Sequence, residues 1–398
     1  MHSIFFVCTF AKQTHYVKNE ITFVYLLVRR KFNKQHLKIN SMIKSLYVEG
    51  LNGRNNPLDL EFNHDLNLLT GKNGSSKTTL LKLIWYLNSA RVNSLIKEVN
   101  FNRAVIITDT YKLDLTKDQD NRFVNISIND EKSFTLSDQN LRELDYRRPV
   151  RINEKLNVIV KNSVPTIFFP TFRRIEGGFS MDNNQFDPAF GRNDEIRDAL
   201  EQLSRKLSFR NQRFITSIST DDIVTLLNSE YSNINSKINL TQKQKSDEII
   251  KKIKDKFQDE KQTLENIKQD IEEMESEREK MLKPFTTLSE LIQTIFHHKG
   301  INLSNLTIGE VNNAISSDKL SAGEKQMLSF ICYNAFTKDH TIFIDEPELS
   351  LHPDWQRTLV PTLLNQGNNN QFFMATHSPF IFSKYSDKEI MLSDDKGE

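Results

Sequence analysis

The sequence predicts an α/β fold in which a mixed sheet carries a phosphate-binding loop, beside an antiparallel β lobe and an inserted helical or coiled-coil subdomain. Three observations lead to this prediction. A glycine-rich loop at 71–79 lies between an apolar segment and a helical pattern. An apolar run at 341–344, typical of a buried strand, ends in two carboxylates. A second apolar run at 372–375 leads into polar residues, so buried strands and polar groups alternate as an α/β site requires.

The run from Gly71 to Thr79 has the composition of a phosphate-binding loop. Glycines let the backbone wrap closely around a polyphosphate, and the N-terminus of the following helix adds partial positive charge. Lys77 is placed to reach the terminal phosphates, and the Thr78 hydroxyl to bind Mg²⁺. The predicted nucleotide-binding residues are Gly71, Asn73, Gly74, Ser75, Ser76, Lys77, Thr78 and Thr79.

One position of this loop departs from the common pattern. G-x-x-x-x-G-K-[ST] expects glycine before the lysine, and this chain has Ser76 there. A serine at this position predicts a loop whose geometry is strained or shifted. The alternative interpretation is a Gly/Ser-rich turn that happens to precede a helix.

Asp345 and Glu346 follow the predicted strand at 341–344. Two carboxylates at the tip of a core strand are costly to bury without a partner, and a cation supplies one. We therefore assign Asp345 to Mg²⁺, directly or through water, and Glu346 to the attacking water as general base. The alternative is a strand end capped by acidic surface residues.

A third motif, Leu320-Ser321-Ala322-Gly323-Glu324, precedes an amphipathic helical stretch. A serine hydroxyl, a glycine and the exposed N–H groups of a helix start form an anion site. This motif resembles the signature sequence of ABC-type ATPases. Asp-Glu-Pro-Glu-Leu-Ser-Leu-His-Pro at 345–353, followed by Ala-Thr-His-Ser-Pro at 375–379, resembles the soluble ATPases related to RecF, SMC and the overcoming-lysogenisation-defect family. The Lys77 loop, the signature, Asp345-Glu346 and His377 occur in that family's order over roughly 42–393.

The resemblance implies a homodimer, or a higher oligomer, that encloses two ATP molecules with Mg²⁺. In that family the signature of one subunit closes over the γ-phosphate held by the loop of the other. His377 matches the histidine that senses the γ-phosphate, so the resemblance makes it a catalytic residue with Glu346. A lone histidine at a strand end is more often only a satisfied polar residue. The residues expected to act on the partner's ATP are Leu320, Ser321, Ala322, Gly323 and Glu324.

The family's glutamine loop has no match at its expected place, after the predicted strand at 166–169. The segment found there, Pro-Thr-Phe-Arg-Arg-Ile-Glu at 170–176, resembles ATPase subunits of bacterial anti-phage systems such as Septu and some retrons. Arg173 and Arg174 then either approach a phosphate or a partner, or form an ordinary solvated pair.

Bulk properties limit the partners and the cellular location. The net charge of +1 indicates no general affinity for nucleic acid, so any contact with DNA or RNA needs local patches. The two candidate patches are Arg147-Arg148-Pro149-Val150-Arg151 and the set Arg205, Lys206, Arg210 and Arg213. Only Cys8 and Cys332 are present, which suits a reducing cytoplasm, and no apolar run approaches the roughly 18–20 residues that cross a bilayer.

The predicted domains follow the motifs. The ranges are 1–41 for a basic extension, 42–193 for the first half of the ATPase head, 194–298 for the helical insertion, and 299–398 for the second half. Either Met42 is the true start, or the extension is a targeting peptide or a basic arm. Within 42–193, alternating residues predict three strands and then an antiparallel meander, and 177–193 reads as a loop.

The insertion contains a heptad seam between Ile250 and Met281, interrupted at Glu260 and Arg278, so a partner helix is needed. We predict a short helical hairpin whose long helix ends at Lys283-Pro284. A plain helical subdomain remains the alternative, and a long SMC-like arm is less favoured. The two seam positions are Ile250, Phe257, Leu264 and Ile271, and Ile253, Ile267, Met274 and Met281.

The leading hypothesis is a cytoplasmic, slow ATPase that dimerises around ATP and regulates a separate effector, such as a nuclease, in anti-phage defence. We expect no nuclease domain in this chain and no membrane partner. The alternatives are a slowly hydrolysing or non-hydrolysing nucleotide switch or scaffold, and a DNA-repair ATPase of the RecF or SMC kind.

Overall fold

The structure is a computed structural model, and the chain divides into Met1–Ser41 and Met42–Glu398. The described residues are 42–89, 91–118, 123–130, 132–137, 163–171, 174–175, 192–208, 211–218, 220–255, 260–296 and 320–393. Several sequence predictions therefore lie outside the described residues. They concern the extension 1–41 with Cys8, the patch 147–151, Arg173, Arg210, and the predicted loop 177–193 up to residue 191.

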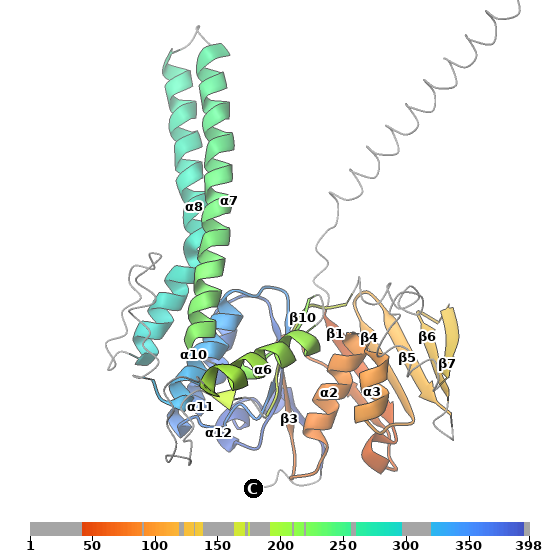
Figure 1. Cartoon of the computed structure of the whole chain (residues 1–398). Coiled ribbons are helices and arrows are strands. Elements are labelled where there is room, and N and C mark those ends of the chain that lie inside the picture. The colour runs from red at the N-terminus through yellow and green to blue at the C-terminus, as the bar shows by residue number, and fades with distance from the viewer. Residues whose placement is uncertain are drawn as a thin grey trace, which may run out of the picture. The chain divides into compact units, whose positions relative to one another are not determined.

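The first sheet is antiparallel and has the strand order β2-β1-β4-β5-β6-β7. Its alternating apolar and polar residues predict such a meander, and the strands form where they are expected (Figure 1). Their bounds are β1 Ile43–Glu49, β2 Leu58–Glu61, β4 Arg103–Thr108, β5 Lys112–Lys117, β6 Phe123–Ile128 and β7 Lys132–Ser137.

The second sheet is parallel, with the strand order β10-β8-β12-β13-β3-β14. Its strands are β3 Leu66–Thr70, β8 Thr166–Phe169, β10 Gln212–Phe214, β12 Thr341–Asp345, β13 Gln371–Ala375 and β14 Glu389–Met391. Parallel strands need crossovers, and helices supply them, so the predicted α/β class is confirmed.

Helices cover both faces of the parallel sheet. Helix α2 (Lys77–Asn88) lies between the two sheets and shares one apolar core with them. On the opposite face, α10 (Ala322–Ala335) and α11 (Pro353–Leu364) pack with the bases of two long helices in a second core. The remaining elements are η1 Leu51–Gly53, α3 Val92–Glu98, β9 Arg174–Ile175, α6 Arg192–Leu207, β11 Ser217–Ile218, α12 Pro379–Phe382 and η4 Ser386–Lys388.

Strand β12 shows how these two cores are divided. Phe343 packs in the core shared with α2, whereas its neighbours Ile342 and Ile344 pack in the core of α10 and α11. Successive side chains of a strand point to opposite faces, so a strand buried on both faces is apolar throughout. Each such side chain contributes about 1.5–3 kcal/mol by leaving water, which holds the sheet rigid beneath its loops.

The insertion is a pair of long helices, α7 (Thr220–Asp255) and α8 (Glu260–Phe296), which lie side by side (Figure 1). The seam predicted between Ile250 and Met281 does not lie on one helix, because α7 ends at Asp255 and α8 starts at Glu260. Ile250 and Ile271 remain 48% and 47% exposed. A heptad pattern is a local signal and does not reveal where the chain reverses.

The predicted helix end at Pro284 is also wrong. Proline lacks the N–H for one helical bond and costs about 3 kcal/mol inside a helix, yet α8 runs through it to Phe296. Three apolar residues that follow it in α8, Phe285, Leu288 and Ile292, are buried in the core with α10. Their burial outweighs the proline penalty, since each contributes about 1.5–3 kcal/mol.

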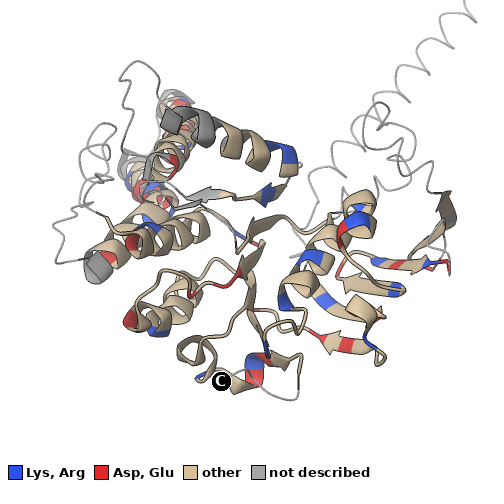
Figure 2. Cartoon of the chain, turned by 60° about the horizontal axis from the view of Figure 1, so that its bottom comes forward, with Lys and Arg blue, Asp and Glu red and all other residues tan. Residues whose placement is uncertain are grey.

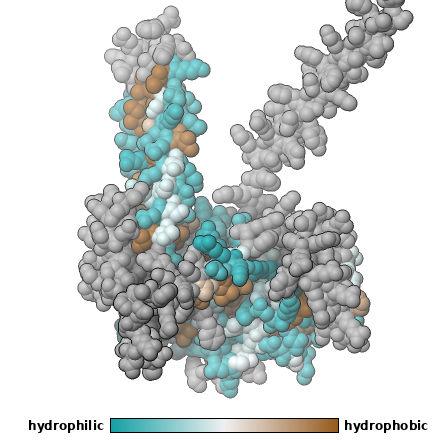
Figure 3. Space-filling model, in the orientation of Figure 1, coloured by the Kyte–Doolittle hydropathy of each residue, from teal (hydrophilic) through white to brown (hydrophobic). Residues whose placement is uncertain are grey.

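Among the described helices, none combines the length and the apolar character that a membrane span requires. The hairpin is long, but its surface is mostly hydrophilic with scattered hydrophobic residues (Figure 3). Lys and Arg positions and Asp and Glu positions are both spread over the described helices and strands (Figure 2).

Candidate functional site

Four segments meet at one edge of the parallel sheet. Strand β3 leads into the loop of Lys77, β12 ends at Asp345, β13 is followed by His377, and β8 is followed by Thr171. Parallel strands present their carboxyl ends at the same edge, and ligands bind there in open α/β sheets. The order of the strands therefore brings together Thr78 and Asp345, which lie 267 positions apart in the sequence.

The loop before α2 adopts the left-handed backbone at three positions. Gly71 and Gly74 have φ values of 135° and 80°, and Ser76 has a φ of 73°. Ser76 thus takes a left-handed conformation that favours glycine, which costs free energy for a non-glycine residue, as the predicted strain requires. Its hydroxyl accepts a hydrogen bond from the Asn52 side chain at 2.8 Å, which helps to hold this conformation.

The Lys77 side chain lies over this loop. Its Nζ donates to the carbonyl oxygens of Gly71 at 2.7 Å and Lys72 at 3.1 Å, and the residue is 6% exposed. Burial lowers the pKa of Lys77, and the charges of Glu346 and Asp345 raise it. The ammonium group is thus already positioned at the loop where a polyphosphate would lie.

The Asp345 carboxylate accepts hydrogen bonds from two hydroxyl groups. Thr78 Oγ1 donates to Oδ1 at 3.0 Å, and the Thr171 hydroxyl donates to Oδ2. Asp345 is 1% exposed, so its charge needs these partners or a cation. Carboxylate and hydroxyl oxygens are ligands that Mg²⁺ accepts, so the donor set of Thr78 and Asp345 fits that ion.

Glu346 follows directly and has a φ of 50°, which is uncommon for a non-glycine residue. Its backbone N–H donates to Ala375 O at 2.8 Å, so the turn after β12 is fastened to the end of β13. The residue is partly exposed at the site edge. Strained backbone of this kind clusters at active sites.

His377 is held from its backbone by a residue that the sequence did not single out for a role. Glu348 Oε1 accepts the N–H of His377 at 2.6 Å, and Oε2 accepts the Thr376 hydroxyl at 2.9 Å. Burial lowers the pKa of the His377 imidazole, and the nearby Lys77 ammonium lowers it further, against the charges of Glu348 and Asp345. The neutral ring is therefore favoured near pH 7.

The signature segment forms the start of α10. Ser321 is the N-cap: its hydroxyl accepts from Glu324 N at 3.4 Å, and the Glu324 carboxylate accepts from Ser321 N at 2.6 Å, a capping box. Ser321 and Ala322 are exposed, whereas Leu320, Gly323 and Glu324 are buried. A Cβ atom on Gly323 would overlap the carbonyl oxygen of Ser350, so only glycine fits.

Four residues at this site were missed by the sequence analysis: Asn52, Thr171, Glu348 and Gln356. Thr171 stands after β8, where a glutamine was sought, and its hydroxyl contacts Asp345. Gln356 accepts the Ser378 hydroxyl and donates to Leu351 O at 2.8 Å. Each acts through a partner distant in sequence, so no local pattern marked it.

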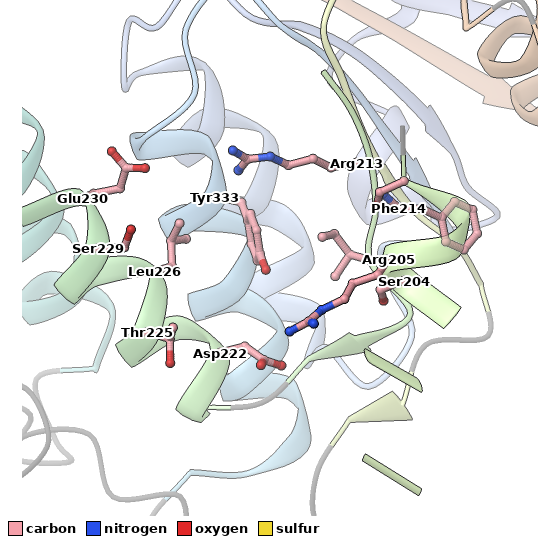
Figure 4. Close-up of a pocket in the computed structure, with 12 residues that line it drawn as sticks. Ser204, Arg205, Arg213, Phe214, Asp222, Thr225, Leu226, Ser229, Glu230 and Tyr333 are labelled. Atoms are coloured by element: carbon pink, nitrogen blue, oxygen red, sulfur yellow. The ribbon is translucent and has the colours of Figure 1, made fainter. Parts of the chain in front are cut away.

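A separate cavity of about 410 Å³ lies at the base of the hairpin, between α6, β10, α7 and α10 (Figure 4). Arg205 and Arg213 of the second predicted patch line it, but so do Asp222 and Glu230 of α7. Burial raises the pKa of Tyr333, which also lines the cavity, to about 12. This mixed lining does not form the purely basic surface that a nucleic-acid backbone favours.

A family model described as "AAA domain, putative AbiEii toxin, Type IV TA system" matches residues 66–383. This chain belongs to that AAA domain family. The match runs from the first residue of β3 to just beyond α12, and so includes the phosphate-binding loop, the signature segment, the Asp345 carboxylate and His377. The expected relation to this class of ATPase domain is confirmed.

Two relatives of this AAA domain carry retron names. The Retron Vc95 probable ATPase of Vibrio cholerae serotype O1 biovar El Tor is 30% identical over 101 residues, which is 22% of this chain and 20% of the relative. The Retron Ec83 probable ATPase of Escherichia coli is 31% identical over 101 residues, 22% of this chain and 19% of the relative. The chain thus matches about a fifth of the length of each relative.

Two solved SMC heads were also found. The Smc head domain with an extended coiled coil bound to the C-terminal domain of ScpA, derived from Pyrococcus furiosus, has a TM-score of 0.41 and 14% identity over 90% of this chain and 94% of the other. The SmcHead bound to the C-winged helix domain of ScpA has a TM-score of 0.36 and 13% identity over 89% of this chain and 95% of the other. The fold of this chain is defined by its own strand order and helices, not by these two structures.

Proposed function

We propose that this AAA domain protein is an ATPase whose two copies enclose Mg²⁺-ATP, and that it regulates a separate effector in anti-phage defence. The observation that carries the proposal is the convergence at the sheet edge. The Lys77 ammonium lies on the loop, and the Thr78 hydroxyl is 3.0 Å from the Asp345 carboxylate. A cation, a polyphosphate cradle and an acidic side chain beside them are the parts that phosphoryl transfer needs.

In this proposal Lys77 and the loop N–H groups bind the phosphates, while Thr78 and Asp345 would hold Mg²⁺. When bound, Mg²⁺ neutralises charge that develops on the phosphate oxygens. Glu346 accepts a proton from the attacking water, and His377 contacts the γ-phosphate with a neutral ring. Glu346 has a φ of 50° in the turn after β12, a costly backbone conformation of the kind found at active sites.

The position of the signature supports the proposed dimer. Helices α2 and α10 pack on opposite faces of the parallel sheet. The phosphate-binding loop precedes α2, and the signature forms the start of α10. Ser321 and Ala322 at the start of α10 are exposed, and the helix offers N–H groups to an anion there. A second copy can place these groups over the γ-phosphate held by the first.

Control of a separate effector, such as a nuclease, is part of the proposal because the segment 170–176 resembles ATPase subunits of anti-phage systems, and two relatives carry retron names. The hairpin of α7 and α8 gives this role a physical route, because its base packs on α10. A change at the signature helix is thereby passed to a long solvated arm that a partner protein can contact.

The first experiment measures binding of a slowly hydrolysed ATP analogue with Mg²⁺ by calorimetry. Lys77→Ala should abolish detectable binding, because the side chain that neutralises the phosphates is lost. Lys82→Ala is the matched control: it removes a lysine on the same helix, 38% exposed and paired with Glu98, and should bind as the wild type does. Equal binding by Lys77→Ala and the wild type would refute the site.

The second experiment measures sedimentation with the same analogue. Ser321→Arg places a bulky cation at the exposed start of α10 and should keep the protein monomeric while binding of the analogue remains within about twofold. Wild-type protein that stays monomeric at saturating analogue would refute the shared site.

A further inference from the structure

The turn after Asp345 contacts two functional segments at once. On one side the Glu348 carboxylate holds the backbone N–H of His377 at 2.6 Å and the Thr376 hydroxyl at 2.9 Å. On the other side Gln326 of α10 donates its side-chain N–H to Pro347 O at 2.9 Å. The residues between Glu346 and Leu351, which we call the relay turn, thus lie between the histidine segment and the signature helix.

The contact between the relay turn and the signature helix is close. No side chain fits on Gly323, because its Cβ would overlap the carbonyl oxygen of Ser350. Ser350 therefore packs directly against the first turn of α10, which bears the exposed Ser321.

The relay turn is held in a costly conformation. Glu346 and Ser350 have φ values of 50° and 65°, although neither is glycine. Such residues persist only where the surroundings hold them, and they occur in segments that switch. Within the described part of the chain, the buried amide oxygen of Gln326 has no hydrogen-bond partner, so that side chain is only partly satisfied in this state.

We propose that Glu348 is a positioning residue that ties the His377 segment to the relay turn, so that occupation of the phosphate site alters the exposed start of the signature helix. This inference rests on the proposed function. Glu348 does not touch the reacting atoms: it acts through the backbone of His377 and through Ser350 against Gly323. Gln356 supports the arrangement by joining Leu351 O to the Ser378 hydroxyl.

The test uses the full chain and hydrogen–deuterium exchange of two peptides, one covering 374–380 and one covering 320–327. Glu348→Ala removes both acceptors, so exchange at 374–380 should rise at least about tenfold even without nucleotide. With Mg²⁺ and the slowly hydrolysed analogue, the protection that the wild type gains at 320–327 should disappear. Glu348→Gln keeps an acceptor for the His377 N–H, so this variant should retain most of the nucleotide-dependent protection at 320–327.

Hydrolysis supplies a second readout. Glu348→Ala should lower the maximal ATPase rate at least about tenfold while analogue affinity changes less than about threefold, because the histidine is misplaced but the loop is intact. Asp354→Asn, a change of an exposed acid that pairs with Arg357, is the control and should match the wild type. If Glu348→Ala does not fold, Thr376→Val is used in its place, because it removes the hydrogen bond between the Thr376 hydroxyl and the Glu348 carboxylate.

Two outcomes overturn the inference. Either exchange at 374–380 is unchanged in Glu348→Ala, or the nucleotide-dependent protection at 320–327 survives in that variant. If the wild type itself binds no analogue, the proposed ATPase function fails instead. The nucleotide-free exchange at 374–380 still decides whether Glu348 holds the histidine segment.

Discussion

In the parallel sheet the strands are covered on both faces, whereas the hairpin of α7 and α8 is buried at its base and solvated further along. Phe343 of β12 is 0% exposed, and Leu288 at the hairpin base is equally buried. Leu240 of the same hairpin is 62% exposed. Burial on both faces fixes the strands, so the loops at the sheet edge stay within hydrogen-bonding distance of each other. An arm that contacts a partner protein instead keeps side chains exposed to solvent. Four variants test this contrast.

The largest effect is expected at the centre of the sheet. Phe343 stacks with Phe168 and Phe373 at ring-centroid distances of 5.8 and 5.2 Å. Phe343→Ala leaves a cavity where the sheet cannot collapse and should lower the free energy of unfolding by about 4 kcal/mol, measured by urea denaturation. Phe123→Ala, at a residue 45% exposed on β6, should cost less than about 1 kcal/mol. Similar losses in both variants would remove the contrast between core and rim.

Next comes the chemistry at the sheet edge. Glu346→Gln should lower the ATPase rate about 100-fold or more, equivalent to about 3 kcal/mol of barrier, because the amide cannot accept the proton of the attacking water. ATP affinity should stay unchanged and the ATP-bound dimer should last longer. The steady-state rate and sedimentation check this, with the hairpin change Glu279→Gln as control. Unchanged turnover in Glu346→Gln would remove Glu346 from the role of base.

A smaller effect is expected at the base of the hairpin. Leu288 packs in the core of α10, so Leu288→Ala should lower the free energy of unfolding by about 2–3 kcal/mol in the same assay. Such a loss would show that the base of the hairpin belongs to the same folded core as α10 and the parallel sheet. A loss below about 0.5 kcal/mol would mean that the whole hairpin behaves as a solvated arm.

The smallest effect is expected further along the hairpin. Ile271 is 47% exposed, so Ile271→Ala should change the free energy of unfolding by less than about 1 kcal/mol. Circular dichroism during urea unfolding measures it. A loss as large as that of Leu288→Ala would show that this part of the arm is covered in solution, contrary to the contrast drawn above.

Much of the fold was accessible from the sequence because its signals are local. The strands at 341–345 and 371–375 are continuous apolar runs bounded by polar residues, as strands buried on both faces must be. The loop before α2 carries its chemistry in consecutive residues, so its position relative to a strand and a helix could be predicted. The hairpin reversal could not, since the heptad pattern continues across it. The helix end predicted at Pro284 was wrong for a similar reason. The proline penalty can be read from the local sequence, but the burial of the residues that follow it depends on tertiary packing.

By itself the sequence predicted the glycine-rich loop before a helix and the two acids after a buried strand, because composition and spacing within nine residues suffice for both. Only the tertiary structure decided that Thr171 meets Asp345, that Asn52 holds Ser76, and that Glu348 rather than Glu346 holds the His377 backbone. These contacts exist because parallel strands from distant parts of the chain end at one edge of the sheet. The order of strands in a sheet depends on how helices pack across its faces, and no short segment records that.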